Sequence, residues 1–289
     1  MLKKSLVLGS GFGLYGYLPA LLKLKKKVYL PRKYKNFLSK RVDLKKYISN
    51  VNFLKNANLN LFDEIIFARR PEDQYNFIRH LKCRPFLFLE KPLAENSFKS
   101  KKLIQILKKK KLKFSVGYLF FFTSWFKKIS KLNKNCKVDI IWNYKSITFK
   151  RNSWKNNYKK GGGIISFYGI HFIALFSFLK LKCYSSSIGI IKEKEKNWYA
   201  VFKKGKINFN LKLNINAKNE FLIKLNNKMI YKAISPFKKK SIKNQVEDSR
   251  VNFLELYIKN KNFLTLKDHS KILNLWEHVV SISKYIHIK

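Results

Sequence analysis

The chain of 289 residues is 46% hydrophobic and 16% aromatic, and its 63 Lys and Arg against 16 Asp and Glu give a formal charge of +47. This apolar content argues against a disordered protein, and the length suffices for one or two folded domains. Three cysteines, none in a CxxC pair, argue against a disulfide framework or a thiolate zinc site. We therefore expect a globular, cytoplasmic protein of a reducing compartment, with no metal site.

The positive charge has two interpretations. A field of this size attracts nucleic acid, anionic membranes or phosphorylated ligands, which makes a basic polyanion-binding protein an alternative function. However, lysine far exceeds arginine, lysines are scattered along the whole chain, and the residues encoded by A/T-rich codons are enriched together. The uncharged stretches 5–22 and 161–179 approach the length of a membrane span, but both are rich in glycine. We expect no specific nucleic-acid partner and no membrane span.

Strand and helix patterns alternate through residues 1–119. Short, almost wholly apolar runs predict strands, and the segments between several of them have helical spacing. Such alternation is typical of a parallel sheet covered on both faces, so we expect an α/β domain here. The predicted strands are 5–8, 28–30, 64–68, 85–89 and 113–118, and the predicted helices are 17–24, 72–81 and 97–110.

The pattern changes over residues 120–289. Runs of alternating apolar and polar residues predict strands with one solvated face, which are typical of antiparallel sheets. We expect a second, α+β domain with a large, mostly antiparallel open sheet. Its predicted strands are 138–149, 198–202, 206–215 and 220–231, and its predicted helices are 164–179, 246–258 and 269–286.

A glycine-rich turn follows the first predicted strand. Gly9-Ser10-Gly11-Phe12-Gly13 stands at a strand–helix junction, where glycines let the backbone approach the diphosphate of a dinucleotide. Counted from Gly9, a G-x-G-x-x-G pattern needs glycine at position 14, where the chain has Leu14. The turn therefore indicates a dinucleotide site, and an ordinary glycine turn remains the alternative.

The end of the second predicted strand bears on the choice of dinucleotide. An acidic residue here would bind the ribose hydroxyls of NAD, whereas a cation accommodates the 2′-phosphate of NADP. The chain has Arg32 and Lys33, and the nearest acid downstream is Asp43. NADP is therefore slightly favoured over NAD.

Three motifs together resemble the Gfo/Idh/MocA family of NAD(P)-dependent oxidoreductases. The first is the glycine turn followed by Tyr17-Leu18-Pro19-Ala20-Leu21, and the second is Glu90-Lys91-Pro92, similar to the family's E-K-P motif. The third is Gly161-Gly162-Gly163 followed by His171, similar to its G-G-G…G-x-H helix start. Order and spacing agree from residue 5 to about residue 179.

The resemblance implies an N-terminal Rossmann domain, a C-terminal domain whose sheet often forms a homo-oligomer contact, and hydride transfer between a nicotinamide and a sugar-like or cyclitol carbon. Lys91 would polarise the reacting oxygen or carry its proton, and His171 would act as acid–base or orient the substrate. The candidate cofactor contacts are Gly9, Gly11, Phe12, Gly13, Arg32, Arg70, Pro71 and Glu90, and the candidate substrate contacts are Tyr118, Trp154 and Tyr168.

One departure from the family matters for catalysis. The family commonly has Asp four residues before the histidine, and this chain has Phe167. A catalytically weakened dinucleotide-binding relative is therefore an alternative function. Each candidate also has an ordinary interpretation: Lys91 as one surface lysine among many, His171 as a core histidine, and Trp154 as a packing aromatic.

Overall fold

The computed structural model describes residues 2–132, 135–145, 153–215, 217–238 and 247–288. The chain forms two compact units. The first comprises Met1–Ala94, Lys102–Leu119 and Lys243–Thr265, and the second comprises Glu95–Lys101, Phe120–Ile242 and Leu266–Lys289. Residues after 119 are expected in the second domain, but the described residues 247–265 belong to the first unit.

The first unit is built on a six-stranded parallel sheet in the order β3-β2-β1-β4-β5-β6. Three central strands are almost wholly apolar and buried because helices cover both faces of the sheet. This is the predicted α/β sheet, now confirmed. The strands are β1 (Lys4–Leu8), β2 (Lys27–Pro31), β3 (Asn52–Leu54), β4 (Glu64–Phe67), β5 (Phe86–Leu89) and β6 (Phe114–Val116).

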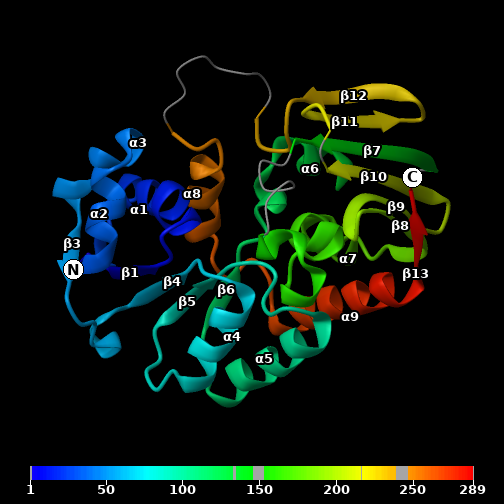
Figure 1. The fold of residues 1–289 in the computed structure, drawn as a ribbon. Coiled ribbons are helices and arrows are strands. Elements are labelled where there is room, and N and C mark those ends of the chain that lie inside the picture. The colour runs from blue at the N-terminus through cyan, green and yellow to red at the C-terminus, as the bar shows by residue number, and fades with distance from the viewer. Residues whose placement is uncertain (1, 133–134, 146–152, 216, 239–246, 289) are drawn as a thin grey trace. The chain divides into compact units, whose positions relative to one another are not determined.

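Helices connect these strands, and Figure 1 shows α1 and α8 on one side of the sheet and α4 on the other. The first connection is continuous helix, an i→i+5 segment η1 (Gly13–Tyr17) followed by α1 (Leu18–Lys23). Lys23 at the end of α1 forms ion pairs with Glu247 and Glu255, which fixes α8 against α1. The other helices here are α2 (Lys35–Ser39), α3 (Val42–Lys45), α4 (Pro71–His80), α5 (Ser97–Lys109, shared with the second unit) and α8 (Val251–Lys259), with short 3-10 turns η2 (Arg32–Tyr34), η3 (Ile48–Asn50) and η4 (Leu59–Leu61).

The second unit is built on a seven-stranded sheet in the order β12-β11-β7-β10-β9-β8-β13. Most neighbouring strands are antiparallel, while β10 with β7 and β13 with β8 are parallel. In β10, buried Phe209, Leu211 and Leu213 alternate with Asn and Lys, as one covered and one open face require. The strands are β7 (Cys136–Tyr144), β8 (Lys182–Ile191), β9 (Lys194–Lys204), β10 (Ile207–Ile215), β11 (Glu220–Leu225), β12 (Lys228–Ala233) and β13 (Ser283–His287).

Helices α7 and α9 lie on the covered face of this sheet (Figure 1). Helix α7 is buried along nearly its whole length because its residues are almost all apolar. The helical elements of this unit are η5 (Leu119–Phe122), α6 (Ser124–Ile129), η6 (Trp154–Asn156), η7 (Tyr158–Lys160), the i→i+5 segment η8 (Ile164–Gly169), α7 (Ile170–Phe178) and α9 (Leu266–Ile282).

The structure corrects the sequence predictions at several elements of the second unit. The predicted strand 220–231 is a hairpin, because Asn226 and Asn227 both have positive φ and reverse the chain. The last predicted helix ends at Ile282 and continues as strand β13. Strand β8 has no predicted counterpart, since its alternation is interrupted by register shifts. Residues 146–149 of one predicted strand lie outside the described residues.

Candidate functional site

The glycine turn after β1 divides three roles among three glycines. Gly9 has φ +149°, and a Cβ there would overlap the carbonyl oxygen of Ala68, so glycine is required for the tight turn. At Gly11 no atom of the described residues lies within 4 Å of an added Cβ, which leaves room for a ligand. A Cβ at Gly13 would lie 3.1 Å from Val7 Cγ1, which shows how closely the helix approaches β1. These are the three roles that glycines play in a dinucleotide-binding turn.

The spacing of this turn differs from G-x-G-x-x-G for a structural reason. The helix begins as an i→i+5 segment, in which the N–H of Leu18 donates to the carbonyl of Gly13. Glycines 11, 13 and 16 fit the same pattern in another register, but a Cβ at Gly16 would overlap the ring of Phe12, so Gly16 serves local packing instead. Phe12 lies over its own helix, with its ring centroid 5.4 Å from that of Tyr17.

The Glu90-Lys91-Pro92 segment follows β5 and is held by a buried side chain. Gln74 of α4 donates to the carbonyls of Glu90 (3.0 Å) and Leu93 (2.9 Å) and accepts from the N–H of Glu90 (2.9 Å). The Lys91–Pro92 peptide is cis. Because Gln74 is only 1% exposed, it acts as an internal clamp on the loop that presents Lys91. The sequence analysis missed Gln74, since a lone Gln in a helix carries no motif.

A polar pair joins this segment to the first helical segment, and its members are the half-buried Glu90 and the buried Tyr17. The hydroxyl of Tyr17 donates to Glu90 Oε1 at 2.7 Å, and a Cβ at Gly117 would lie 3.1 Å from both oxygens. Burial raises the pKa of Glu90, against smaller lowering effects of Lys91, Tyr17 and Arg250. Burial, and then Glu90, also raise the pKa of Tyr17. Both groups therefore hold their protons more strongly than in water.

The remaining candidates of the first unit lie where strands of its sheet end. Arg32 is exposed and directly follows β2. Arg70 is exposed at the N-cap of α4, and Pro71 is buried as its first residue. Tyr118 follows β6 and is only 2% exposed, and burial raises the pKa of its hydroxyl. The carboxyl ends of β1, β2, β4, β5 and β6 thus carry all the candidate residues of this unit.

The triple glycine of the second unit is closely packed. Gly161 has φ +79° and ends the turn η7. A Cβ at Gly162 would overlap the carbonyl oxygen of Trp154, and one at Gly163 (φ +82°) would overlap the carboxylate of Glu195. The protein's own atoms thus fill the space that the missing side chains leave.

Glu195 of β9 is a functional candidate that sequence analysis missed. Its Oε2 accepts a hydrogen bond of 2.6 Å from the N–H of Ile164, the first residue of η8. Burial raises the pKa of this carboxyl, and the bond from Ile164 opposes the shift. The carboxylate therefore fixes the start of the helical segment that continues into α7 and carries His171. Glu195 belongs to no motif, and it lies before the predicted strand 198–202, so the sequence did not mark it.

His171 and the aromatic candidates lie in an aromatic cluster. His171 is 6% exposed, and its ring stacks on Phe120 with centroids 4.5 Å apart. Phe167 contacts Trp154 edge-on at 5.5 Å and Tyr168 at 4.9 Å, and the ammonium of Lys155 lies 5.4 Å from the centre of its ring. Tyr168 is buried and Trp154 is half-buried. Lys91 belongs to the first unit and His171 to the second.

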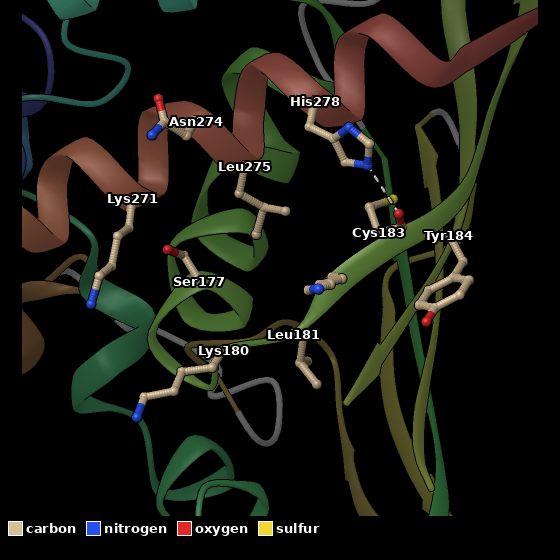
Figure 2. A pocket seen from close by; sticks show the side chains of 10 residues that line it. Ser177, Lys180, Leu181, Cys183, Tyr184, Lys271, Asn274, Leu275 and His278 are labelled. Atoms are coloured by element: carbon tan, nitrogen blue, oxygen red, sulfur yellow. Dashed lines mark hydrogen bonds between the residues drawn. The ribbon is translucent and has the colours of Figure 1, made fainter. Parts of the chain in front are cut away.

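A cavity of about 660 Å³ lies elsewhere in the second unit, between α7, β8 and α9 (Figure 2). Figure 2 shows Lys271, Asn274, Leu275 and His278 along α9, and His278 donates to the carbonyl of Cys183 at 3.1 Å. None of the predicted site residues lines this cavity. Its lining residues are Ser177, Lys180, Leu181, Lys182, Cys183, Tyr184, Lys271, Asn274, Leu275 and His278.

The described residues contain neither a membrane-spanning helix nor a cluster of metal-ligating side chains. Within these ranges no helix is both long and apolar enough to cross a bilayer. Nor do three or more His, Cys, Asp or Glu side chains of the described ranges come together as metal ligands would.

Solved structures with the same fold include nicotinamide-dependent enzymes. No family model matches the sequence, and the search of curated proteins finds no relative. The KijD10 3-ketoreductase of Actinomadura kijaniata, in complex with NADP and TDP-benzene, has a TM-score of 0.73 at 10% identity and covers 100% of both chains. The WlbA dehydrogenase of Thermus thermophilus, in complex with NAD and UDP-GlcNAcA, has 0.68 at 11%, covering 100% of this chain and 97% of its own. The MviM dehydrogenase of Clostridium difficile has 0.65 at 16%, with 96% and 99% covered. At these identities the likeness shows that the chain shares the fold of these oxidoreductases.

Proposed function

We propose that this protein is an NAD(P)-dependent oxidoreductase of the Gfo/Idh/MocA type. One observation carries the proposal: the open glycine turn and the Glu90-Lys91-Pro92 segment follow β1 and β5, at the same carboxyl edge of one parallel sheet. In doubly wound sheets, ligands bind at this edge where the strand order reverses, here between β1 and β4. The shared fold with NAD- and NADP-bound enzymes supports the same reading.

The first unit fits a dinucleotide. The open position at Gly11 admits a diphosphate, which a side chain there would block. Glu90 would contact the nicotinamide ribose, and Arg32, exposed after β2, would accommodate a 2′-phosphate and so favour NADP. When bound, the nicotinamide supplies the hydride acceptor or donor.

Acid–base chemistry falls to Lys91 and His171 in this proposal. When an alcohol is oxidised, its hydroxyl proton must leave as the hydride departs, and reduction needs the reverse. The ammonium of Lys91 would polarise the reacting oxygen or carry that proton, while the imidazole of His171 would orient the substrate or exchange the proton. Gln74 acts through Lys91 by holding its loop, and Glu195 acts through His171 by holding its helix.

The substrate class that we propose is a sugar-like or cyclitol alcohol or ketone, with Tyr118, Trp154 and Tyr168 as contacts. The sugar-nucleotide and nucleotide-analogue ligands of the two neighbours make nucleotide-linked sugars the first compounds to try. We also propose a homo-oligomer through the open face of the second sheet, on which Asn210 bonds Asp139 (2.7 Å) and Asn214 bonds Asn143 (2.5 Å). Light scattering of the wild type and of Lys212→Glu, a change on that face, tests the oligomer.

The central test combines cofactor titration with a substrate screen. NADH and NADPH should quench or enhance protein fluorescence saturably at moderate salt, and UDP- and TDP-sugars should be turned over with one of them. Lys91→Ala should lower kcat by about 10²- to 10⁴-fold with nearly unchanged cofactor affinity. Unchanged turnover in that variant would remove Lys91 from the mechanism. Polyanion binding that collapses with salt, without any dinucleotide response, would favour the polyanion-binding alternative.

A catalytically weakened relative is the second candidate, and one observation favours it. Phe167 lies among Trp154, Tyr168 and Lys155, where the family has a carboxylate. In that case the wild type binds dinucleotide without turnover, and Phe167→Asp raises activity. Turnover in the wild type that Phe167→Asp lowers would exclude this candidate.

A further inference from the structure

A guanidinium from the last third of the sequence lies beside the glycine turn. Arg250 directly precedes α8 and belongs to the first unit together with that turn. Its guanidinium carbon lies 4.3 Å from the centre of the Phe12 ring and 5.6 Å from that of Tyr15. Phe12 belongs to the glycine turn, so the guanidinium lies beside a residue of the turn in which the described residues leave the space at Gly11 open.

Asp248 fixes the orientation of this guanidinium. Nε donates to Asp248 Oδ1 and Nη2 to Oδ2, each at 2.8 Å, and the backbone N–H of Arg250 donates to Oδ1 at 2.9 Å. The two-point ion pair occupies one edge of the planar group, and the side chain is 32% exposed. A guanidinium carries five N–H donors, and the bonds to Asp248 and to the Tyr15 side chain leave donors that the described residues do not occupy.

The surroundings make this charge part of the carboxyl edge of the sheet. Arg250 is close enough to Glu90 to act on its carboxyl, although burial dominates the pKa of that group. Lys23 anchors the same segment through Glu247, at 2.5 Å, and through Glu255. The segment that starts at Glu247 is therefore held in two places. Lys23 holds it at the end of α1, and the contact of Arg250 with Phe12 holds it at the glycine turn.

We propose that Arg250 binds the diphosphate of the dinucleotide, an inference that rests on the proposed function. The guanidinium fork matches pairs of phosphate oxygens, and the diphosphate in such folds lies at the turn after the first strand. Arg32 stands instead after β2, where the 2′-phosphate belongs. The two arginines thus bind different parts of the cofactor. Arg250 binds the diphosphate that NADH and NADPH share, and Arg32 binds the 2′-phosphate that only NADPH carries.

Binding titrations test this division without any measurement of turnover. The ligands are NADH, NADPH, ADP-ribose, which has the diphosphate but no nicotinamide, and 2′-AMP, which has only the 2′-phosphate. Arg250→Gln should weaken the first three by a similar factor of roughly 10 to 100, the loss of charge-assisted hydrogen bonds. Arg250→Gln should leave the affinity for 2′-AMP unchanged. Arg32→Ala should weaken the binding of NADPH and 2′-AMP only.

Matched controls separate a specific contact from lost charge or lost structure. Lys271→Gln removes one charge in the second unit and should change no dissociation constant. Arg250→Lys keeps the charge without the fork and should still weaken ADP-ribose, and it serves as the test if Arg250→Gln does not fold in urea titrations. The inference is overturned if either folded variant binds ADP-ribose with unchanged affinity. It is also overturned if the affinity for 2′-AMP falls as much as the affinity for ADP-ribose. If the wild type binds none of the dinucleotide ligands, the proposed function itself fails.

Discussion

Two glycine motifs look alike in this sequence and differ in what surrounds them. In the turn after β1, an added Cβ at Gly11 meets no described atom within 4 Å. In the triple glycine before η8, Cβ atoms at Gly162 and Gly163 would overlap the backbone of Trp154 and the carboxylate of Glu195. The first motif leaves space at Gly11 that a ligand would occupy, whereas the second motif is closed at Gly162 and Gly163 by the chain itself.

Glycine spacing in a sequence therefore indicates that some group lies close to the backbone. It does not tell whether that group is a ligand or another part of the protein. A glycine without neighbouring atoms is expected at a binding site. A side chain there would lower the affinity for the ligand and leave the free energy of unfolding unchanged. A glycine against backbone atoms favours stability, because a side chain there would force the loop apart. Substitutions to alanine should therefore separate the two motifs by opposite effects on folding and on binding.

The largest effect is expected at Gly162. A methyl group there overlaps the carbonyl oxygen of Trp154 and the backbone of Lys155, which cannot move as a flexible side chain would. Gly162→Ala should lower the free energy of unfolding by about 3 kcal/mol or more. Urea denaturation measures this loss, and a change below about 1 kcal/mol would contradict the packing role.

An intermediate effect is expected at Gly13. Its added Cβ would lie 3.1 Å from Val7 Cγ1 and 3.5 Å from Ala68 Cβ, so these side chains must yield by tenths of an ångström. Gly13→Ala should cost about 1–2 kcal/mol of unfolding free energy. Urea denaturation should place the loss of unfolding free energy for Gly13→Ala between those for Gly162→Ala and Gly11→Ala. A loss as large as that of Gly162→Ala would argue against this ranking.

A pH-dependent effect is expected at Glu195, which closes the second motif. Burial raises the pKa of its carboxyl above the usual value of 4.5, so the folded state binds the proton more tightly than the unfolded state. Its contribution to stability is full below about pH 4.5 and declines as the pH rises through the raised pKa.

Glu195→Gln keeps an acceptor for the N–H of Ile164 and removes the titration. At low pH the variant should match the wild type within about 1 kcal/mol, and its advantage should grow as the pH rises. Urea denaturation across pH 4 to 8 measures how the unfolding free energy depends on pH. The same pH dependence in both proteins would contradict the role of Glu195.

The smallest effect on folding is expected at Gly11. Its φ is not in the left-handed region and its surroundings are open, so Gly11→Ala should change the unfolding free energy by no more than about 1 kcal/mol, possible stabilisation included. The same methyl group occupies the space proposed for the diphosphate, so NADPH affinity should fall roughly tenfold. Undiminished affinity would show that the dinucleotide does not approach this turn.

Much of the first unit could be predicted from local pattern alone. Runs such as the Phe86–Leu89 strand are apolar on both faces, a signal that is typical of a doubly covered sheet. Strand β3 and helices α2 and α3 were not predicted, because they are short and half exposed. In the second unit, the parallel pairing of β13 with β8 involves residues distant in sequence and leaves no local signature.

The candidate site divides in the same way. Motifs marked Gly9, Glu90, Lys91 and His171 by type and order, but no motif marks Gln74, Glu195 or Arg250. The roles of these three residues depend on which loop, helix or turn the fold brings against them.

The amino-acid sequence by itself determined the α/β and α+β character of the two regions and the positions of the glycine motifs, because apolar periodicity and missing side chains are properties of the chain. Only the tertiary structure decided that residues 247–265 join the first unit, that Gly11 is open while Gly162 and Gly163 are closed, and that Arg250 lies beside Phe12 of the glycine turn. The physical reason is that these facts rest on contacts between residues far apart in sequence, where packing and ion pairing select the partner.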